Sequence, residues 1–290
     1  MNREPTHGGI SFQAAFVGDE LMFDAAQQRG WDEDGYFLIP GFSEPDVGRA
    51  MLERVVEISR EAGGQIIHEG YVVMPEQNLA DAMDPAAEAE QRVSKIFRLH
   101  RDGPFRAFIE SPRILDIGRG LLGPRIDCFL SQFIFKNPAA WGQPWHQDSF
   151  YFPFDRAPQA GFWLAVTEAT LDNGCLWVLP GSHREPIHEH GPDRRPDANI
   201  GYVEIMDHDF SEERPVVMAP GDLLVFHSHL MHRSKDNRSD GLRAAMVYHM
   251  AEHGTKDRAN PPTPVNDWMC LPDADAVGAA RGSEASNEEA

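Results

Sequence analysis

The two halves of the chain differ in the spacing of their hydrophobic residues. In the first half, apolar residues recur at three- or four-residue intervals over roughly residues 20–29, 43–62, 85–93 and 104–122, which predicts amphipathic helices. For the second of these, Ser43 is the candidate N-cap and Gly63 follows the last helical position. The long connection 65–90 is expected to be a lid or a disordered loop, and within it the irregular stretch 68–85 is expected to form a flap.

The second half contains short runs of β-branched and aromatic residues separated by clusters of Gly, Pro, Asn and Asp. Many short strands with turn residues between them are typical of a barrel or a double-sheet jelly roll. The chain is therefore predicted to be α+β, with a double-stranded β-helix (jelly-roll, cupin-like) core buttressed by N-terminal helices. The long connection 184–214 is expected to be a lid or a disordered loop.

The interior of the chain shows no repeat and no linker-like segment, so a single domain is expected over residues 16–270. Residues 1–15 are polar and contain glycine, and they are predicted to be a flexible N-terminus. Residues 271–290 are small and acidic. Such a segment buries too little apolar surface to offset its ordering entropy, so this tail is expected to be disordered.

Composition narrows the possible partners. The formal net charge of −20 opposes binding to nucleic acids and anionic membranes, since both depend on Lys and Arg. The three cysteines are far apart and form no C-x-x-C pair, and the chain shows neither a signal peptide nor an apolar run of about 20 residues. We therefore expect a cytoplasmic protein, a monomer or weak homo-oligomer, whose partner is a small-molecule substrate.

The strongest local motif is P-W-H-Q-D, in which His146 and Asp148 are two positions apart. In an extended strand these side chains project to the same face. One imidazole and one carboxylate are two-thirds of the 2-His-1-carboxylate site of non-haem Fe(II) enzymes. A surface histidine near an aspartate is the alternative, because H-x-D is common by chance. His227, His229 and His232, at or just past the end of an apolar strand, are the candidates for a third ligand.

An arginine opens the next predicted strand, R-A-A-M-V-Y-H-M, where Arg243 would share a face with Ala245 and Val247. A buried guanidinium needs a partner, and its planar fork matches a carboxylate. A dicarboxylate cosubstrate, bound to a metal at one end and to Arg243 at the other, would supply that partner. A structural salt bridge is the alternative.

Three separated stretches carry a resemblance to a known family: WHQDSFYFPF at 145–154, WLAVTEATLDNGCLWVLPGSH at 163–183 and GDLLVFHSHLMHRSKDNRSDGLRAA at 221–245. Over about residues 30–260 the chain resembles the phytanoyl-CoA dioxygenase family, and most of all its phytanoyl-CoA dioxygenase domain-containing proteins. The resemblance implies a double-stranded β-helix fold. It also implies a dioxygenase that uses Fe(II), 2-oxoglutarate and O₂ to hydroxylate a C–H bond of a small organic substrate, releasing succinate and CO₂.

The resemblance also assigns residues. It places the iron ligands and catalytic centre at His146, Asp148 and His232, because the family's distal histidine precedes its cosubstrate arginine by eleven positions. Arg243 then matches the partner of the 2-oxoglutarate C5 carboxylate. Further cosubstrate residues implied by the resemblance are Ser234 beside Arg243, with Lys95, Gln132 and Trp163 along the pocket.

Other functions compete with this hypothesis. Related halogenases replace the acidic ligand with a small residue, so the presence of Asp148 favours hydroxylation. A cupin-like metalloenzyme without 2-oxoglutarate would leave Arg243 and Ser234 unexplained, and so would a zinc hydrolase. A non-catalytic protein that binds 2-oxoglutarate and metal is the third alternative, which the intact ligand set disfavours.

Overall fold

The computed structural model describes residues 23–79 and 86–273, so the predicted flexible N-terminus and most of the predicted acidic tail lie outside the described residues. The helical elements are α1 (Ala25–Glu33), α2 (Pro45–Ala62), η2 (Gln77–Leu79), η3 (Ala89–Arg92), α3 (Gly103–Ile109), α4 (Pro112–Leu122), η4 (Asp148–Phe150) and η5 (Ser182–Arg184). The strands are β1 (Tyr36–Ile39), β2 (Ile67–His68), β3 (Tyr71–Pro75), β4 (Val93–Phe97), β5 (Ile126–Lys136), β6 (Ala160–Ala165), β7 (Leu176–Val178), β8 (His190–Pro192), β9 (Val203–Ile205), β10 (Arg214–Val216), β11 (Leu223–His227), β12 (His232–Ser234), β13 (Arg243–Glu252) and β14 (Met269–Cys270).

Three of the four helix predictions, 20–29, 43–62 and 104–122, are correct in place but wrong at their boundaries. Helix α1 continues through Gly30 to Glu33; an added Cβ at Gly30 would lie 2.9 Å from the Tyr36 carbonyl oxygen, so the glycine permits a close approach rather than ending the helix. Helix α2 has Glu44 rather than Ser43 at its N-cap. The single helix expected over 104–122 is two helices, because a proline at 112 disfavours helical backbone in the residue before it.

The first half also contains strands that the helical pattern did not predict. Strands β1 to β4 all precede residue 100, and β2 and β3 form a hairpin within the long connection expected to be a lid or a disordered loop. The helix expected at 85–93 is only the short 3₁₀ turn η3, and part of that window lies outside the described residues. Short apolar runs do not distinguish a strand from a helix until their tertiary neighbours are known.

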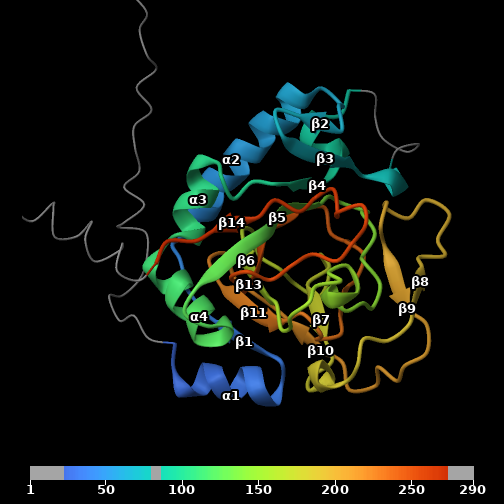
Figure 1. Cartoon of the computed structure of the whole chain (residues 1–290). Coiled ribbons are helices and arrows are strands. Elements are labelled where there is room, and N and C mark those ends of the chain that lie inside the picture. The colour runs from blue at the N-terminus through green and yellow to red at the C-terminus, as the bar shows by residue number, and fades with distance from the viewer. Residues whose placement is uncertain (1–22, 80–85, 274–290) are drawn as a thin grey trace, which may run out of the picture.

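Most strands belong to one antiparallel sheet, in the order β1-β11-β6-β13-β5-β4-β3-β2, with β14 paired to β5. Helices α2 and α4 pack against β13, and α4 also contacts β5 and β6. Figure 1 shows these helices on the outer side of the sheet, with the β8–β9 hairpin on the opposite side of the molecule. The predicted α+β class is confirmed as a mixed fold with mainly antiparallel sheets.

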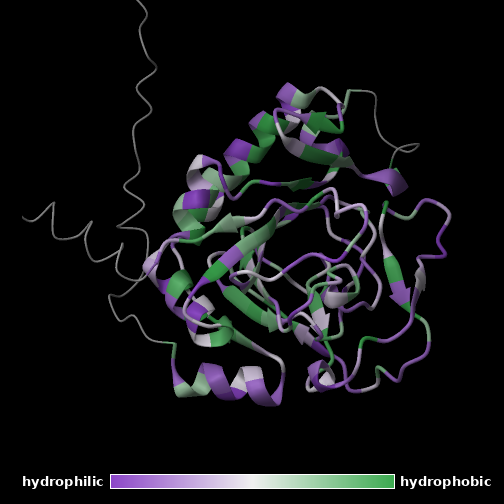
Figure 2. Ribbon diagram, in the orientation of Figure 1, coloured by the Kyte–Doolittle hydropathy of each residue, from purple (hydrophilic) through white to green (hydrophobic). Residues whose placement is uncertain are grey.

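A second, three-stranded sheet, β10-β7-β12, lies over the other face of the large sheet. The two faces of β13 alternate as a strand requires. Met246 and Tyr248 join the core beneath the helices, whereas Ala245 and Val247 join the cluster between the sheets. Figure 2 shows this concentration of hydrophobic residues in the central strands, in contrast to the mainly hydrophilic α1.

The predicted face shared by Arg243, Ala245 and Val247 is therefore correct, and it points between the two sheets. Among the residues that the structure describes, none of the helices combines the length and apolar character needed for a membrane crossing.

Candidate active site

The backbone brings the H-x-D motif next to a distant histidine. His146 and His232 form an isolated antiparallel bridge, with each backbone N–H donating to the other residue's carbonyl at 3.0 Å. Gln147 is extended (φ −116°, ψ 130°), and Asp148 opens the 3₁₀ helix η4. The expected strand at the motif is thus reduced to a bridge and one extended residue. That is enough to orient His146 and Asp148 to the same side.

The three side chains converge. The Nε2 atoms of His146 and His232 lie 3.6 and 3.7 Å from Oδ1 of Asp148. Each imidazole donates its Nδ1–H to a backbone carbonyl, of Pro144 at 2.8 Å and of Leu230 at 3.0 Å. Because a carbonyl only accepts, these bonds leave the Nε2 lone pairs directed at the space beside the carboxylate. Two oriented imidazoles and one carboxylate fit a metal ion such as Fe(II).

Burial and electrostatics keep His232 and Asp148 in the protonation states that a metal requires. Burial, with His146 nearby, lowers the pKa of His232 to about 4, so the imidazole is neutral at pH 7. Burial alone would raise the pKa of Asp148. The neighbouring His232, His146 and His249 outweigh it and hold that pKa well below its ordinary value. Asp148 is therefore an anion across the physiological range.

The other two candidate histidines lie elsewhere. His227 packs against Trp31, with ring centroids 5.1 Å apart, and its Nδ1 accepts the backbone N–H of His229. Neither residue lines the cavity that contains His232. The third position of the cluster is thus filled by His232, as the resemblance implied.

A cavity of about 690 Å³ opens above this cluster. The eight residues that the family resemblance assigns to the site all line it: Lys95, Gln132, His146, Asp148, Trp163, His232, Ser234 and Arg243. Its size is within the range of about 300–1,000 Å³ that is typical of small-molecule sites. Much of the remaining wall is aliphatic or aromatic and includes Val72, Met74, Leu130, Phe152 and Val265.

Arg243 is an unpaired buried cation at one end of this cavity. It is 1% exposed, and within the described part of the chain its Nε and Nη1 atoms have no hydrogen-bond partner. Its guanidinium carbon lies 5.6 Å from the centre of the Trp163 ring. Burial lowers the pKa of Arg243 to about 10, which still leaves it charged at pH 7. Such a group requires an anionic partner, and the structural salt bridge considered as the alternative is not present among the described residues.

Sequence reasoning missed a second basic group in the same place. Lys136 is opposite Arg243 in the β13–β5 register and is 3% exposed. Burial, followed by the charge of Arg243, lowers its pKa well below the ordinary value. Its Nζ donates to Ser234 Oγ and to the Lys235 carbonyl, each at 2.7 Å. The feature of the sequence that could have indicated Lys136 is a lysine at the end of the apolar run I-D-C-F-L-S-Q-F-I-F-K.

Ser234 Oγ accepts two hydrogen bonds, from Lys136 Nζ and, at 3.1 Å, from the backbone N–H of Gln143. A hydroxyl has one proton and two acceptor lone pairs, so its own O–H remains available as a donor. The part of the cavity near Arg243 thus combines a guanidinium, the Lys136 amino group and a free hydroxyl proton. This donor set fits a carboxylate.

Lys95, Gln132 and Trp163, the further cosubstrate residues implied by the resemblance, line the same cavity. Trp163 and Gln132 lie on opposite sides of Val247 in the sheet. Lys95 donates to Gln143 Oε1 at 3.1 Å. Gln143 was not predicted, and its amide nitrogen lies 3.1 Å from His146 Nε2.

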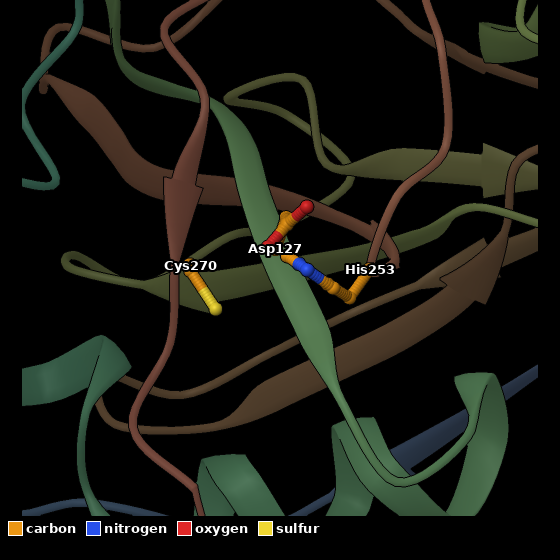
Figure 3. A group of neighbouring side chains, drawn as sticks. All are labelled: Asp127, His253 and Cys270. Atoms are coloured by element: carbon orange, nitrogen blue, oxygen red, sulfur yellow. Dashed lines mark hydrogen bonds and ion pairs between the residues drawn. The ribbon is translucent and has the colours of Figure 1, made fainter.

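A separate cluster of potential metal ligands, Asp127, His253 and Cys270, lies near the start of β5 (Figure 3). His253 Nδ1 is 2.8 Å from Asp127 Oδ1, which accounts for both groups as a hydrogen-bonded pair. None of the three lines the cavity. The cluster is therefore not part of the candidate active site.

Solved structures share this fold. One is EctD from S. alaskensis with 2-oxoglutarate and 5-hydroxyectoine: 19% identity, TM-score 0.64, covering 89% of this chain and 88% of that chain. Another is the epimerase SnoN in complex with Fe³⁺, alpha ketoglutarate and nogalamycin RO: 20% identity, TM-score 0.59, covering 81% and 87%. At 19% and 20% identity, these two likenesses show a shared fold.

The chain belongs to the phytanoyl-CoA dioxygenase family, whose model, Phytanoyl-CoA dioxygenase (PhyH), matches residues 31–245, and therefore to the non-haem iron, 2-oxoglutarate-dependent oxygenases. The peroxisomal phytanoyl-CoA dioxygenase of Bos taurus is 29% identical, covering 83% of this chain and 72% of that protein. The phytanoyl-CoA dioxygenase domain-containing protein 1 of Rattus norvegicus is 28% identical, covering 78% and 89%. The family predicted from three sequence stretches is confirmed.

Proposed function

We propose that this protein hydroxylates a C–H bond of a small organic molecule, with His146, Asp148 and His232 holding Fe(II) and Arg243 anchoring 2-oxoglutarate. One observation carries the proposal: a His-Asp-His cluster and an unpaired buried guanidinium line the same cavity. A bound metal ion alone would account for the His-Asp-His cluster, but it would leave the buried guanidinium of Arg243 without an anionic partner. A dicarboxylate with a keto-acid end explains both.

Each residue has a distinct task in this proposal. The carbonyls of Pro144 and Leu230 fix the tautomers of the two imidazoles, so their Nε2 lone pairs face the metal. Arg243, Lys136 and the Ser234 hydroxyl bind the distal carboxylate, and Trp163 packs beside the guanidinium. The buried walls exclude water from the reaction, which strengthens these charge interactions. With iron, 2-oxoglutarate and O₂ bound, the cofactor set supplies an oxidant for the substrate C–H bond, and succinate and CO₂ leave.

The substrate is proposed to have a substantial apolar part. Val72, Leu130, Phe152 and Val265 line the cavity, and none of them provides a polar side-chain atom for recognition. The carboxylate ligand Asp148 favours hydroxylation over halogenation, because it fills the position that a halide would need.

The finer structural assignments are also part of this proposal. We assign the paired antiparallel sheets to a double-stranded β-helix (jelly roll), within a single domain over residues 16–270. The cytoplasm is the proposed compartment. It is supported by three free cysteines, of which Cys128 and Cys175 are buried, as expected in a reducing environment.

The deciding experiment loads the full chain anaerobically with Fe(II) and 2-oxoglutarate and then admits O₂ with a panel of candidate substrates. Succinate formation coupled to substrate oxidation is expected for wild type and not for the His232→Ala variant. A cupin-like enzyme would oxidise a substrate without producing succinate. Slow 2-oxoglutarate decay that no compound in a broad panel accelerates would favour the non-catalytic alternative.

A further inference from the structure

Two limbs of the segment that follows η5, residues 185–192 and 203–210, pack behind the H-x-D motif, on the side away from the metal cluster. Because side chains alternate along extended backbone, Trp145 and Gln147 face away from the metal cluster. Gln147 is fully buried. Its Nε2 donates to the carbonyls of Pro186 and His229, at 3.1 and 2.9 Å, and its Oε1 accepts the backbone N–H of His188 at 2.8 Å.

The second limb, residues 203–210, packs on Trp145. The rings of Trp145 and Phe210 stack with centroids 4.4 Å apart and an angle of 1°. The backbone N–H of Ile205 donates to the Trp145 carbonyl at 2.8 Å. The two limbs, 185–192 and 203–210, are joined by the β8–β9 pairing, which Figure 1 shows at the edge of the molecule.

One cluster connects these limbs next to the motif. Glu185 Oε2 lies 2.9 Å from His188 Nε2 and 3.0 Å from His208 Nε2. The side chains of His188 and His208 are 24% and 17% exposed, so they are partly shielded from water. Two imidazole nitrogens and one carboxylate oxygen thus meet at a single point, from positions 23 residues apart at most.

In a neutral His208, the Nε2 atom faces the Glu185 carboxylate with neither a proton nor a metal ion between them. The Nδ1 atom of His208 is 2.8 Å from the Asp209 carbonyl oxygen, which can only accept, so Nδ1 carries a proton. In the neutral ring, Nε2 then presents a lone pair to the carboxylate of Glu185, and two acceptors repel one another. A second ring proton or a metal ion between them resolves the repulsion. A histidine that donates its other N–H to a backbone carbonyl is the usual arrangement at metal sites.

We propose that Glu185, His188 and His208 bind a Zn²⁺ ion that is distinct from the iron and serves the structure of the protein. Nitrogen and carboxylate ligands match the preference of Zn²⁺ for imidazole with Asp or Glu, and water completes the four-coordinate shell. The ion ties together the two limbs that hold Trp145 and Gln147. It thereby fixes from behind the backbone that carries His146 and Asp148.

The test measures zinc stoichiometry in the full chain. Because Zn²⁺ also occupies 2-His-1-carboxylate sites, the background is an Asp148→Ala/His232→Ala variant that cannot hold metal in the candidate active site. This variant is stripped with a chelator, reloaded with Zn²⁺, separated from free ions and analysed by elemental analysis. It should retain a single zinc ion per chain.

Adding Glu185→Gln and His208→Asn to this background should remove that ion. Adding His253→Asn, which alters the separate Asp127–His253–Cys270 cluster (Figure 3), should leave it bound. A background chain that retains no zinc overturns the proposal. So does a Glu185→Gln/His208→Asn chain that retains it.

A second measurement avoids the possibility that the variants fail to fold. In the wild-type chain, Zn²⁺ should slow modification of His188 and His208 by diethylpyrocarbonate, mapped by mass spectrometry, because the ion occupies the reactive nitrogens. His68, whose side chain is 18% exposed and which belongs to none of the potential metal clusters of the described residues, is the internal reference and should react at the same rate with and without zinc. Equal rates at His188 and His208 in the two conditions would overturn the proposal even if the predicted iron chemistry holds.

Discussion

Replacing Arg243 with alanine removes the cation that we assign to the far carboxylate of 2-oxoglutarate. The guanidinium is 1% exposed, and two of its nitrogens have no acceptor within the described structure, so a bound carboxylate would be their main partner. Loss of one member of a buried, hydrogen-bonded charge pair typically costs about 2–5 kcal/mol. A loss of about 3 kcal/mol corresponds to a roughly 100-fold weaker affinity for 2-oxoglutarate.

The effect of this substitution on folding should be much smaller. The pKa of Arg243 falls to about 10 on burial, so the charged form is destabilised by the folded protein, by about 3 kcal/mol. The sign follows from linkage: a cation with a lower pKa in the folded chain weakens folding at every pH below that value. Alanine removes this penalty, which offsets part of the packing lost with the side chain. The melting temperature of the ligand-free protein should therefore change little.

Titrating 2-oxoglutarate into anaerobic, metal-loaded protein measures both quantities. The wild-type melting temperature should rise with ligand concentration, whereas the Arg243→Ala protein should need about 100-fold more ligand for the same rise. The affinity of Arg243→Lys for 2-oxoglutarate should lie between those of wild type and Arg243→Ala, because lysine keeps the positive charge but lacks the planar guanidinium. Arg156→Ala, at an exposed ion pair with Glu252, is the control for loss of an arginine. Unaltered affinity in Arg243→Ala would refute the assigned anchor.

Three further predictions concern metal binding by Asp148, the backbone at Gly142 and the pH dependence of stability that His227 causes. Asp148→Ala should lose tightly bound iron and all 2-oxoglutarate-dependent turnover, checked by metal analysis and succinate assay; full activity would contradict the ligand assignment. Gly142→Ala would put a Cβ 1.9 Å from the Ser234 carbonyl oxygen, so its free energy of unfolding should fall by about 1–3 kcal/mol. Gly103→Ala, which has open space around it, is the matched control and should be neutral or slightly stabilising. Burial, with His229 adjacent, lowers the pKa of His227 to about 3, so below pH 6.5 the unfolded chain binds a proton that the folded chain does not. The free energy of unfolding should therefore fall between pH 6.5 and about pH 3, and denaturant titrations should show a shallower fall in His227→Gln.

Much of the site was predictable because its residues are chemically distinctive and their family pattern is specific. The H-x-D motif and an arginine at the start of an apolar strand each indicate a function before any coordinates are known. Lys136 was overlooked because a lysine at the end of an apolar run is usually solvated. Only the pairing of β5 with β13 places it opposite Arg243, where it becomes a buried second basic group.

Local pattern was less reliable for the fold. The break between α3 and α4 follows from a proline and could have been predicted. The continuation of α1 through Gly30 could not, because the close approach to the Tyr36 carbonyl that this glycine permits is set by the folded structure. The cluster of Glu185, His188 and His208 also required coordinates, because two loop limbs bring its members together.

The sequence by itself determined the family, the mixed fold class and the residue types needed for iron and a dicarboxylate, because these depend on chemical identity and spacing along the chain. The tertiary structure decided that Lys136 lies opposite Arg243, and that Nε and Nη1 of Arg243 have no acceptor among the described residues. Those outcomes depend on how distant segments pair across the sheets. Spacing along a chain does not specify that pairing, whereas hydrogen bonding and burial do.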